Sequence, residues 1–295
     1  MNILKRTKRK FFYILNHSLS HKVMIYCDGG ICSQINMFCI GKFFEENGYK
    51  VLYDVTWFET NGRDLNGKKN RDLVFQRVFP NIKFNKASTK KATFYREHFI
   101  SNEPDYKKLK PPVYLPLYYE AFPYFFKYRT FFIENLKPEG FYDNPNNISL
   151  FNEINSNADT CAVHVRRGDL SIPIQSYGEP PEIHYFLSAI EKIFELNNNT
   201  RFYFFSDDTN WVKNNILPKL NNNTNYTLLT QNTENNGYMD LYLISKCKHV
   251  IASQGSFGLF AYVLSKMTGE LICPESLPPN KKRIIKDNIL NIQFL

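Results

Sequence analysis

The sequence lacks several patterns that would place it in common protein classes. Its six cysteines form no C-x-x-C pair and its six histidines show no metal-ligand spacing, so we expect reduced, buried thiols and no structural metal. No apolar run reaches the roughly 18 residues of a membrane-spanning helix, which favours a cytoplasmic chain. Neither the G-x-G-x-x-G fingerprint nor a D-x-D metal motif occurs. The missing fingerprint argues against an enzyme that transfers hydride from a bound dinucleotide.

The net charge of +9 over 295 residues is concentrated at the two ends of the sequence. Six basic residues and no acid lie within 1–22, and four basic residues lie within 281–286. The remainder holds 27 basic residues against 28 acidic ones, so no nucleic acid partner is expected. Residues 1–22 combine this charge with large apolar side chains. They are either a solvated terminus or a segment that contacts anionic lipid at the inner face of the cytoplasmic membrane.

The order of predicted elements indicates an α/β protein. Residues 22–27 and 50–55 are typical of strands, and the apolar spacing between them predicts a helix that ends at Asn47-Gly48. After an Asn-rich stretch, a second alternation of strands and helices begins at Thr160. Two Rossmann-like domains with the ligand between them are therefore expected. The predicted divisions are a basic arm (1–21), a first domain (22–157) and a second domain (158–295).

The strongest candidate site is His164-Val165-Arg166-Arg167-Gly168-Asp169, which follows a predicted strand. Ligands of doubly wound sheets bind at the carboxyl ends of the strands. An arginine suits a phosphate because its planar fork donates two parallel hydrogen bonds and stays charged. Asp169 is placed to orient one of the two arginines. The alternative is an Arg–Asp pair that only stabilises a tight turn.

Three weaker candidates also follow predicted strands. Phe205-Ser206-Asp207-Asp208 places two carboxylates there, of which Asp208 is expected to cap the next helix. Ser253-Gln254-Gly255-Ser256-Phe257 offers small residues and backbone N–H groups to a phosphate. Asp28, Gly29 and Gly30, with Gln34 beyond them, form a polar turn in the first half. A phosphate clamp in the second half facing this turn predicts a nucleotide-sugar transferase.

These motifs resemble those of a known superfamily. His164–Asp169 is similar to the H-x-R-R-G-D motif of fucosyltransferases that use GDP-fucose, and the motif order resembles the bacterial α-1,2-fucosyltransferases of glycosyltransferase family 11. Residues 202–211 resemble the family's F-S-D-D-x-x-W, and residues 240–264 resemble its D-L-x-L-M-S-x-C-K-H segment. The resemblance implies a GT-B fold, with two Rossmann-like domains facing across a cleft. It also implies an acceptor-side first domain and a second domain that binds the GDP-sugar.

The resemblance further implies transfer of L-fucose from GDP-β-L-fucose to a galactosyl hydroxyl, with inversion and without a metal or cofactor. Arg166, Asp169 and His164 would be catalytic. The donor would be bound by Arg166 and by six further residues, namely Arg167, Asp207, Asp240, Ser253, Ser256 and Phe257. The acceptor side would hold Asp28, Gly29, Gly30 and Gln34. A galactose-containing oligosaccharide or a lipid-linked glycan of bacterial surface polysaccharide is the expected acceptor.

The sequence departs from the family pattern at two places. The opening motif keeps Gly29, Gly30 and Gln34 but has Cys32 where the family has a third glycine. The run after Phe257 has no tryptophan, since Leu259 and Phe260 stand there. Two alternatives therefore remain open at this stage. One is a related transferase with a different nucleotide sugar, and the other is a non-catalytic protein that binds glycan or membrane.

Overall fold

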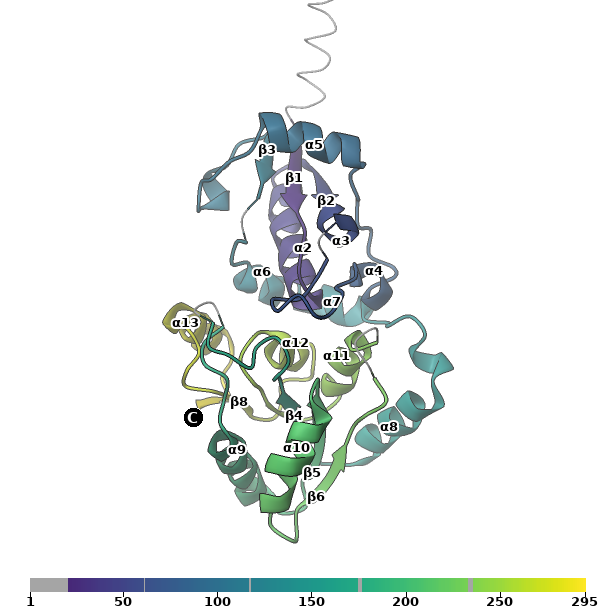
Figure 1. The fold of residues 1–295 in the computed structure, drawn as a ribbon, viewed down its shortest axis with the longest axis vertical. Coiled ribbons are helices and arrows are strands. Elements are labelled where there is room, and N and C mark those ends of the chain that lie inside the picture. The colour runs from purple at the N-terminus through teal and green to yellow at the C-terminus, as the bar shows by residue number, and fades with distance from the viewer. Residues whose placement is uncertain (1–20, 61, 117, 175–176, 233–235) are drawn as a thin grey trace, which may run out of the picture. The chain divides into compact units, whose positions relative to one another are not determined.

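A computed structural model describes residues 21–295 except 61, 117, 175–176 and 233–235 (Figure 1). The predicted membrane contact of residues 1–22 therefore lies, apart from His21 and Lys22, outside the described residues. The contacts divide the chain into two compact units. Unit 1 comprises the described residues up to Arg63, together with Arg71–Phe75 and Ile82–Phe125. Unit 2 comprises Asp64–Asn70, Gln76–Asn81 and Phe126–Leu295.

Unit 1 is built on a small sheet in which all strand pairs are parallel. Its strand order is β2 (Lys50–Asp54), β1 (Lys22–Tyr26), β3 (Val113–Leu115). The predicted helix between the first two strands is α2 (Ile31–Glu46), and Gly48 follows it with a φ of 82°. The remaining elements are short: α3 (Thr56–Thr60), α5 (Thr89–His98), η1 (Tyr106–Lys108), and α4 (Phe75–Val78) and α6 (Phe122–Lys127) at the unit boundaries. The predicted βαβ start is confirmed.

Unit 2 contains a parallel sheet of six strands in the order β6-β5-β4-β7-β8-β9. The strands are β4 (Thr160–Val165), β5 (Arg201–Ser206), β6 (Asn225–Leu228), β7 (His249–Ile251), β8 (Leu271–Cys273) and β9 (Ile292–Phe294). The helices that connect them are α9 (Ile183–Leu196), α10 (Thr209–Asn215), α11 (Tyr238–Ile244), α12 (Phe257–Val263) and α13 (Pro279–Asn288), with η3 (Leu217–Lys219) after α10. The α/β class predicted from the sequence is confirmed in both units.

The chain leaves β4 in one direction along the sheet and later returns to its other side. It runs from β4 through β5 to β6, and then crosses back to β7, β8 and β9. Because parallel crossovers are right-handed, α9 and α10 cover one face of the sheet and α11, α12 and α13 cover the other. The carboxyl ends of β4 and β7 therefore form the switch point where doubly wound sheets bind ligands.

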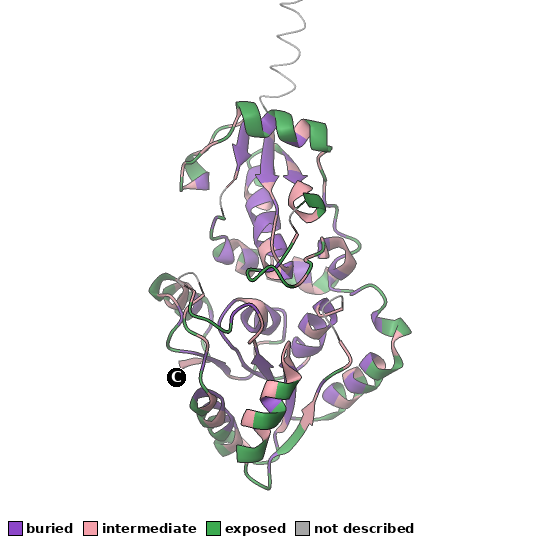
Figure 2. Cartoon of the chain, viewed as in Figure 1, coloured by how far each residue is buried: buried purple, intermediate pink, exposed green. Residues whose placement is uncertain are grey.

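The core of unit 2 lies where the strands meet these helices. Phe202 and Phe204 of β5 pack with Phe186 and Ile190 of α9, and all four are buried. Figure 2 shows the buried strands and the exposed outer surfaces of α9 and α10. All six cysteines are free thiols, and five of them are buried. Within the described ranges, no helix is long and apolar enough to cross a membrane.

Unit 2 begins earlier than the boundary predicted after residue 157. Its first helices are α7 (Arg129–Asn135) and α8 (Pro145–Ser156), with η2 (Phe141–Asp143) between them. Arg129 donates through Nε to the carbonyl of Val263 at 2.6 Å, at the end of α12. The ring of Phe141 lies edge-on against Tyr242 of α11, with centroids 4.8 Å apart. These tertiary contacts attach the segment to the second sheet.

Candidate functional site

The candidate site lies at the switch point of unit 2, where Arg166 follows β4. The Nη1 atom of Arg166 lies 2.8 Å from Oδ2 of Asp207, and its Nη2 atom pairs with Oδ1 of Asp169. Both carboxylates are largely buried, and the arginine side chain is 22% exposed. A guanidinium has five N–H donors, so two ion pairs orient it and leave donors for a ligand. Asp169 therefore orients Arg166, as its position in the motif predicted.

Asp207 also fixes the backbone of the same turn. Its Oδ1 accepts the N–H of Arg167 at 2.8 Å. A Cβ at Gly168 would lie 2.3 Å from Asp207 Oδ2, so a larger residue there would displace this carboxylate. The neighbouring Asp208 has a different task, because its Oδ1 accepts the N–H of Trp211 at 2.9 Å and caps α10. The predicted helix cap at Asp208 is confirmed.

The side chain of Arg167 extends to the α9 and α10 side of the sheet. Its Cζ lies 4.5 Å from the ring centroid of Trp211, and its Nη1 donates to the carbonyl of Pro181 at 3.5 Å. Arg167 borders an open cavity of about 440 Å³, whose other lining residues are Glu182, Ile183, His184, Leu187, Trp211 and Lys219. The side chains of the two adjacent arginines thus have different neighbours. Of the two, only Arg166 contacts the carboxylates of both Asp169 and Asp207.

The turn after β7 packs against the loop that carries Arg166. Ser253 is buried, and the single proton of its Oγ is shared between Oε1 of Gln254 at 2.5 Å and the carbonyl of Arg166 at 3.5 Å. The Nε2 of Gln254 donates to the carbonyl of Leu170 at 2.6 Å. Gly255 adopts a φ of 91°, a conformation that favours glycine. Two of the candidate segments predicted from the sequence are therefore brought together here.

His164 is buried between these two segments. Its ring stacks on that of Phe257, with centroids 5.2 Å apart, and its Nδ1 is buried without a hydrogen-bond partner. Burial, reinforced by the charge of Arg166, lowers the pKa of His164 to about 4. The ring is therefore neutral at pH 7. It provides an apolar surface and one unsatisfied nitrogen beside the turn.

Asp240 lies in the first turn of α11, which starts at the same edge of the sheet. Its Oδ1 accepts a hydrogen bond of 2.6 Å from Nδ2 of Asn232. Asn232 and Asn147 of α8 exchange amide hydrogen bonds of 3.0 and 3.1 Å. Burial raises the pKa of Asp240 to about 7. Sequence analysis predicted no role for the two asparagines: Asn147 lies in the Asn-rich stretch between the two predicted domains, and Asn232 lies in no motif.

The sequence profile described as glycosyl transferase family 11 matches residues 76–293, which include all of these unit 2 segments. The chain belongs to glycosyl transferase family 11. Two relatives from Escherichia coli are similar to it. The O-antigen biosynthesis glycosyltransferase WbnK is 26% identical over 142 residues, covering 46% of this chain and 45% of the relative. An α-1,2-colitosyltransferase is 27% identical over 143 residues, covering 45% and 47% respectively.

The chain spans about half the length of these curated relatives. Among solved structures, the fucosyltransferase NodZ from Bradyrhizobium matches with a TM-score of 0.40 and 13% identity, covering 83% of this chain and 92% of that one. POFUT1 in complex with GDP-fucose matches with a TM-score of 0.42 and 9% identity, covering 94% and 98%. The resemblance inferred from the three motifs is confirmed at the level of the family.

In the family 11 chain, the polar turn of unit 1 is held together by Gln34. The Nε2 of this buried side chain donates to the carbonyls of Gly29 at 3.1 Å and Asp72 at 2.9 Å, while its Oε1 accepts two backbone N–H groups of residues 74–75. Gly29 has a φ of 71°, and no atom lies within 4 Å of a Cβ built on Gly30. Gln34, predicted on the acceptor side, thus shapes the turn through backbone contacts.

Asp28 is the titratable side chain of the unit 1 turn. Its Oδ1 accepts a hydrogen bond of 3.3 Å from Oγ of Ser33. Burial raises the pKa of Asp28, and the Ser33 bond acts in the opposite direction. Ser33 therefore contacts the candidate carboxylate directly.

A cation that the sequence did not connect with the site comes from α13. Lys281 Nζ donates to the carbonyl of Gly255 at 2.6 Å and to Oγ of Ser256 at 3.2 Å. In the sequence this lysine is one of the four basic residues within 281–286. Nothing in the run distinguishes it from its neighbours, since only the fold brings it to a turn 26 residues earlier.

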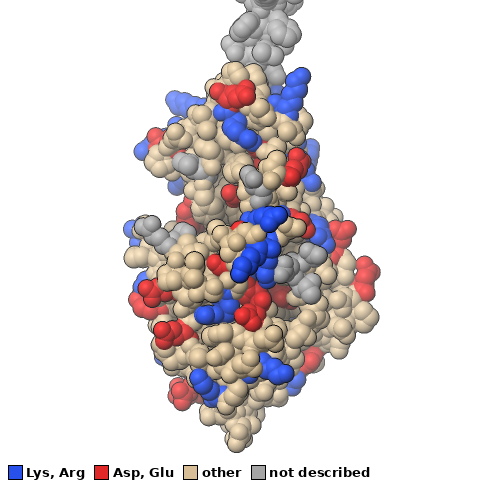
Figure 3. Space-filling model, in the orientation of Figure 1, with Lys and Arg blue, Asp and Glu red and all other residues tan. Residues whose placement is uncertain are grey.

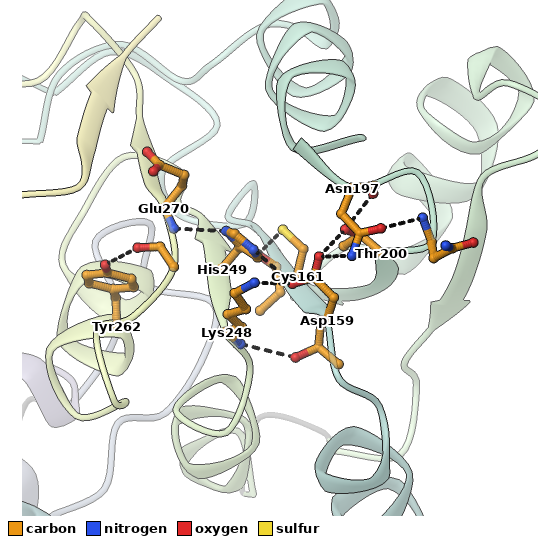
Figure 4. A network of polar contacts seen from close by, with 12 residues as sticks. Asp159, Cys161, Asn197, Thr200, Lys248, His249, Tyr262 and Glu270 are labelled. Carbon is orange, nitrogen blue, oxygen red and sulfur yellow. Dashed lines mark hydrogen bonds and ion pairs between the residues drawn. The ribbon is translucent and has the colours of Figure 1, made fainter. Parts of the chain in front are cut away.

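The opposite edge of the same sheet is tied together by a buried polar network (Figure 4). Asp159 accepts hydrogen bonds from Thr200 and Asn197 and contacts Lys248 at 2.8 Å and His249 Nε2 at 3.1 Å. His249 Nδ1 accepts the N–H of Glu270, so Nε2 carries the proton of the neutral ring. Burial alone would raise the pKa of Asp159, but these bonds together lower it. The network joins the amino ends of the strands and is structural.

Acidic and basic side chains lie next to one another on the face shown in Figure 3. This distribution agrees with the near-neutral body found in the sequence. Over the described ranges, no three His, Cys, Asp or Glu side chains are grouped so that they could hold a metal ion. At the end of β4, Arg166 is paired with Asp169 and Asp207.

Proposed function

We propose that the chain transfers L-fucose from GDP-β-L-fucose to a galactosyl hydroxyl in α-1,2 linkage, with inversion and without a metal. The observation that carries this proposal is Arg166, held at the switch point by Asp169 and Asp207 and packed against the turn that begins at Ser253. Family membership supports glycosyl transfer. The names of the two relatives support an α-1,2 linkage and a role in O-antigen synthesis.

In this reaction the acceptor oxygen forms a bond to C1 of the sugar while the bond from C1 to the β-phosphate oxygen breaks. Negative charge grows on the departing GDP, so donors aimed at its phosphates stabilise the transition state more than the ground state. Arg166 is oriented for this task before the donor binds, because its two carboxylates fix the fork. His164, being neutral at pH 7, adds no positive charge to that of Arg166.

The acceptor hydroxyl loses a proton as its oxygen attacks. Asp28 and Asp169 are the two candidate carboxylates for accepting it. Asp169 is engaged by Arg166, whereas burial raises the pKa of Asp28. A raised pKa makes a carboxylate a better proton acceptor at neutral pH, so by its chemistry Asp28 is the stronger base of the two.

A second nucleotide sugar is also supported as the substrate that donates the sugar. One relative is named as an α-1,2-colitosyltransferase, so a protein similar to this chain uses a donor sugar other than fucose. The contacts of Arg166 concern the phosphates and do not select a hexose. A GDP-linked deoxyhexose other than fucose is therefore the second candidate, with the same chemistry at C1.

A thermal shift series tests the donor. A ligand that binds only the folded state at 100 times its Kd stabilises it by about 2.7 kcal/mol. GDP-fucose and GDP are expected to raise Tm, and UDP-sugars are not. A shift with UDP-sugars alone would contradict the proposed donor. A non-catalytic glycan-binding protein would be stabilised by a β-galactoside while leaving GDP-fucose intact.

We place the reaction at the inner face of the cytoplasmic membrane, on a galactose-containing oligosaccharide or lipid-linked glycan. The basic residues 1–22 would provide the contact with anionic lipid. Removing residues 1–20 is expected to abolish sedimentation with anionic vesicles and to leave transfer to a soluble galactoside unchanged. Unchanged sedimentation would contradict this role of the arm.

A further inference from the structure

The lysines of the basic run 281–286 make different contacts in the structure. Lys282 pairs with the carboxylate of Glu275 and donates to its carbonyl at 2.9 Å, while Lys286 lies 5.2 Å from the ring centroid of Phe294. Lys281 instead contacts the turn after β7 through Gly255 and Ser256. Residues that are adjacent in the sequence therefore place their charges on different parts of the surface.

The charge of Lys281 lies at the carboxyl edge of the sheet. Its two hydrogen bonds place it at the end of β7. It also acts on Cys273, the last residue of β8: burial raises the pKa of this thiol to about 12, and the lysine charge opposes that shift. The ammonium group is thus close to the ends of two neighbouring strands, on the side of the switch point opposite to β5.

The site needs positive charge beyond that of Arg166. The guanidinium faces the carboxylates of Asp169 and Asp207, so its charge is compensated within the protein. A nucleoside diphosphate carries at least two negative charges, and an uncompensated anion in a partly buried site is costly. A lysine ammonium has three donors and acts as a compact point charge for phosphate.

The turn that Lys281 contacts is the one that packs on the Arg166 loop. Ser253 bonds to the carbonyl of Arg166, and Gln254 bonds to that of Leu170. A buried nitrogen without a partner, His164 Nδ1, lies beside the same turn, where its ring stacks on Phe257. Buried polar atoms are normally hydrogen-bonded, so this nitrogen can accept or donate a bond to a polar group that reaches the turn.

We propose that Lys281 is a donor-binding residue whose ammonium group contacts the diphosphate of the nucleotide sugar. The proposal rests on the proposed function and assigns the positive charge that Arg166, paired with two carboxylates, does not supply. When the diphosphate binds, the ammonium keeps Ser256 Oγ within reach and turns a donor towards a phosphate oxygen. As GDP leaves, the same contact stabilises the added charge.

Isothermal titration with GDP tests this role on the full-length protein. K281Q keeps an amide donor for the Gly255 carbonyl but removes the charge, whereas K281R keeps the charge. K282Q is the matched control, since Lys282 pairs with Glu275. We expect K281Q to weaken GDP binding on the order of 10-fold, with K281R within about 3-fold of the wild type and K282Q unchanged. Circular dichroism and Tm confirm that each variant folds.

The outcomes separate this inference from the proposed function. Wild-type affinity in K281Q, or an equal loss in K282Q, would show that Lys281 only fastens α13 to the turn and overturn the inference alone. If the wild type binds UDP instead of GDP, the same variants are titrated with UDP, and the same comparison decides. If the wild type binds no nucleoside diphosphate, the inference and the proposed function fail together.

Discussion

Arg166 Nη1 lies 2.8 Å from Asp207 Oδ2, and this contact joins the residue after β4 to the residue after β5. The other oxygen of Asp207 accepts the N–H of Arg167. One carboxylate therefore fixes both the direction of the guanidinium and the backbone that carries it. The adjacent Asp208 only caps a helix, which gives the chain a natural pair of residues for comparison.

D207N is expected to lower kcat/KM on the order of 10-fold with little change in Tm. The amide still accepts the Arg167 N–H, but the charge that orients Arg166 is lost. D208N is the matched control, because asparagine caps helices about as well as aspartate. Steady-state kinetics with GDP-fucose measures both variants. Equal activities of D207N and D208N would contradict the orienting role.

R166K is expected to lower kcat/KM by about 100-fold or more. Lysine keeps the charge but has no planar fork, so it cannot hold two carboxylates and a phosphate in the same geometry. R167K provides the comparison, since Arg167 stacks on Trp211 and contacts Pro181. The decrease in kcat/KM of R167K is expected to be smaller than that of R166K. Wild-type turnover of R166K would refute the role of the guanidinium.

G168A is expected to reduce both stability and activity. The added Cβ would lie 2.3 Å from Asp207 Oδ2, and the carboxylate must move from its position between the two arginines. Overpacking of this kind costs roughly 1–3 kcal/mol. G30A is the control, since no atom lies within 4 Å of a Cβ built there. Urea denaturation measures the free energy of unfolding, and equal values for the two variants would contradict the close approach.

Asp240 is expected to make stability depend on pH near neutrality. Its pKa is about 7 in the folded chain because it is buried, against roughly 3.9 when exposed in the unfolded chain. Between these values the folded state holds a proton that the unfolded state has released, so stability falls as pH rises to about 7. D240N removes this loss of stability with rising pH, and the new amide oxygen still accepts the hydrogen bond from Asn232.

Thermal unfolding from pH 4 to pH 8 measures this effect. D240N is expected to exceed the wild type in Tm at pH 8, by roughly 2–4 °C for each kcal/mol gained. The difference should shrink towards zero as pH falls to about 4. A Tm difference that stays constant across the range would show that Asp240 titrates normally.

Local sequence signals predicted the part of the site that depends on consecutive residues. The motif from His164 to Asp169 follows a buried strand, and its glycine turn and orienting carboxylate are encoded within six positions. The cap formed by Asp208 is equally local. The strand order was not needed for these predictions. They followed from the rule that parallel strands present ligand sites at their carboxyl ends.

Contacts between distant segments could not be predicted in the same way. Lys281 reaches Gly255 only because α13 returns to the end of β7, and its sequence neighbours are equally basic. Asn147 and Asn232 lie 85 positions apart and pair only once α8 has packed on α11. Gln34 had the position of a ligand-binding residue, but its hydrogen bonds in unit 1 go to backbone groups that the sequence does not identify.

Metal-free transfer by the Arg166 site is the central claim, and mass spectrometry of the product tests it most directly. The full-length protein is incubated with GDP-fucose and a panel of β-galactosides in the presence of EDTA. The account predicts a galactoside that gains one deoxyhexose and releases GDP, at a rate that added Mn²⁺ does not raise. Loss of all product in EDTA with rescue by Mn²⁺, or no transfer to any galactoside, would contradict it.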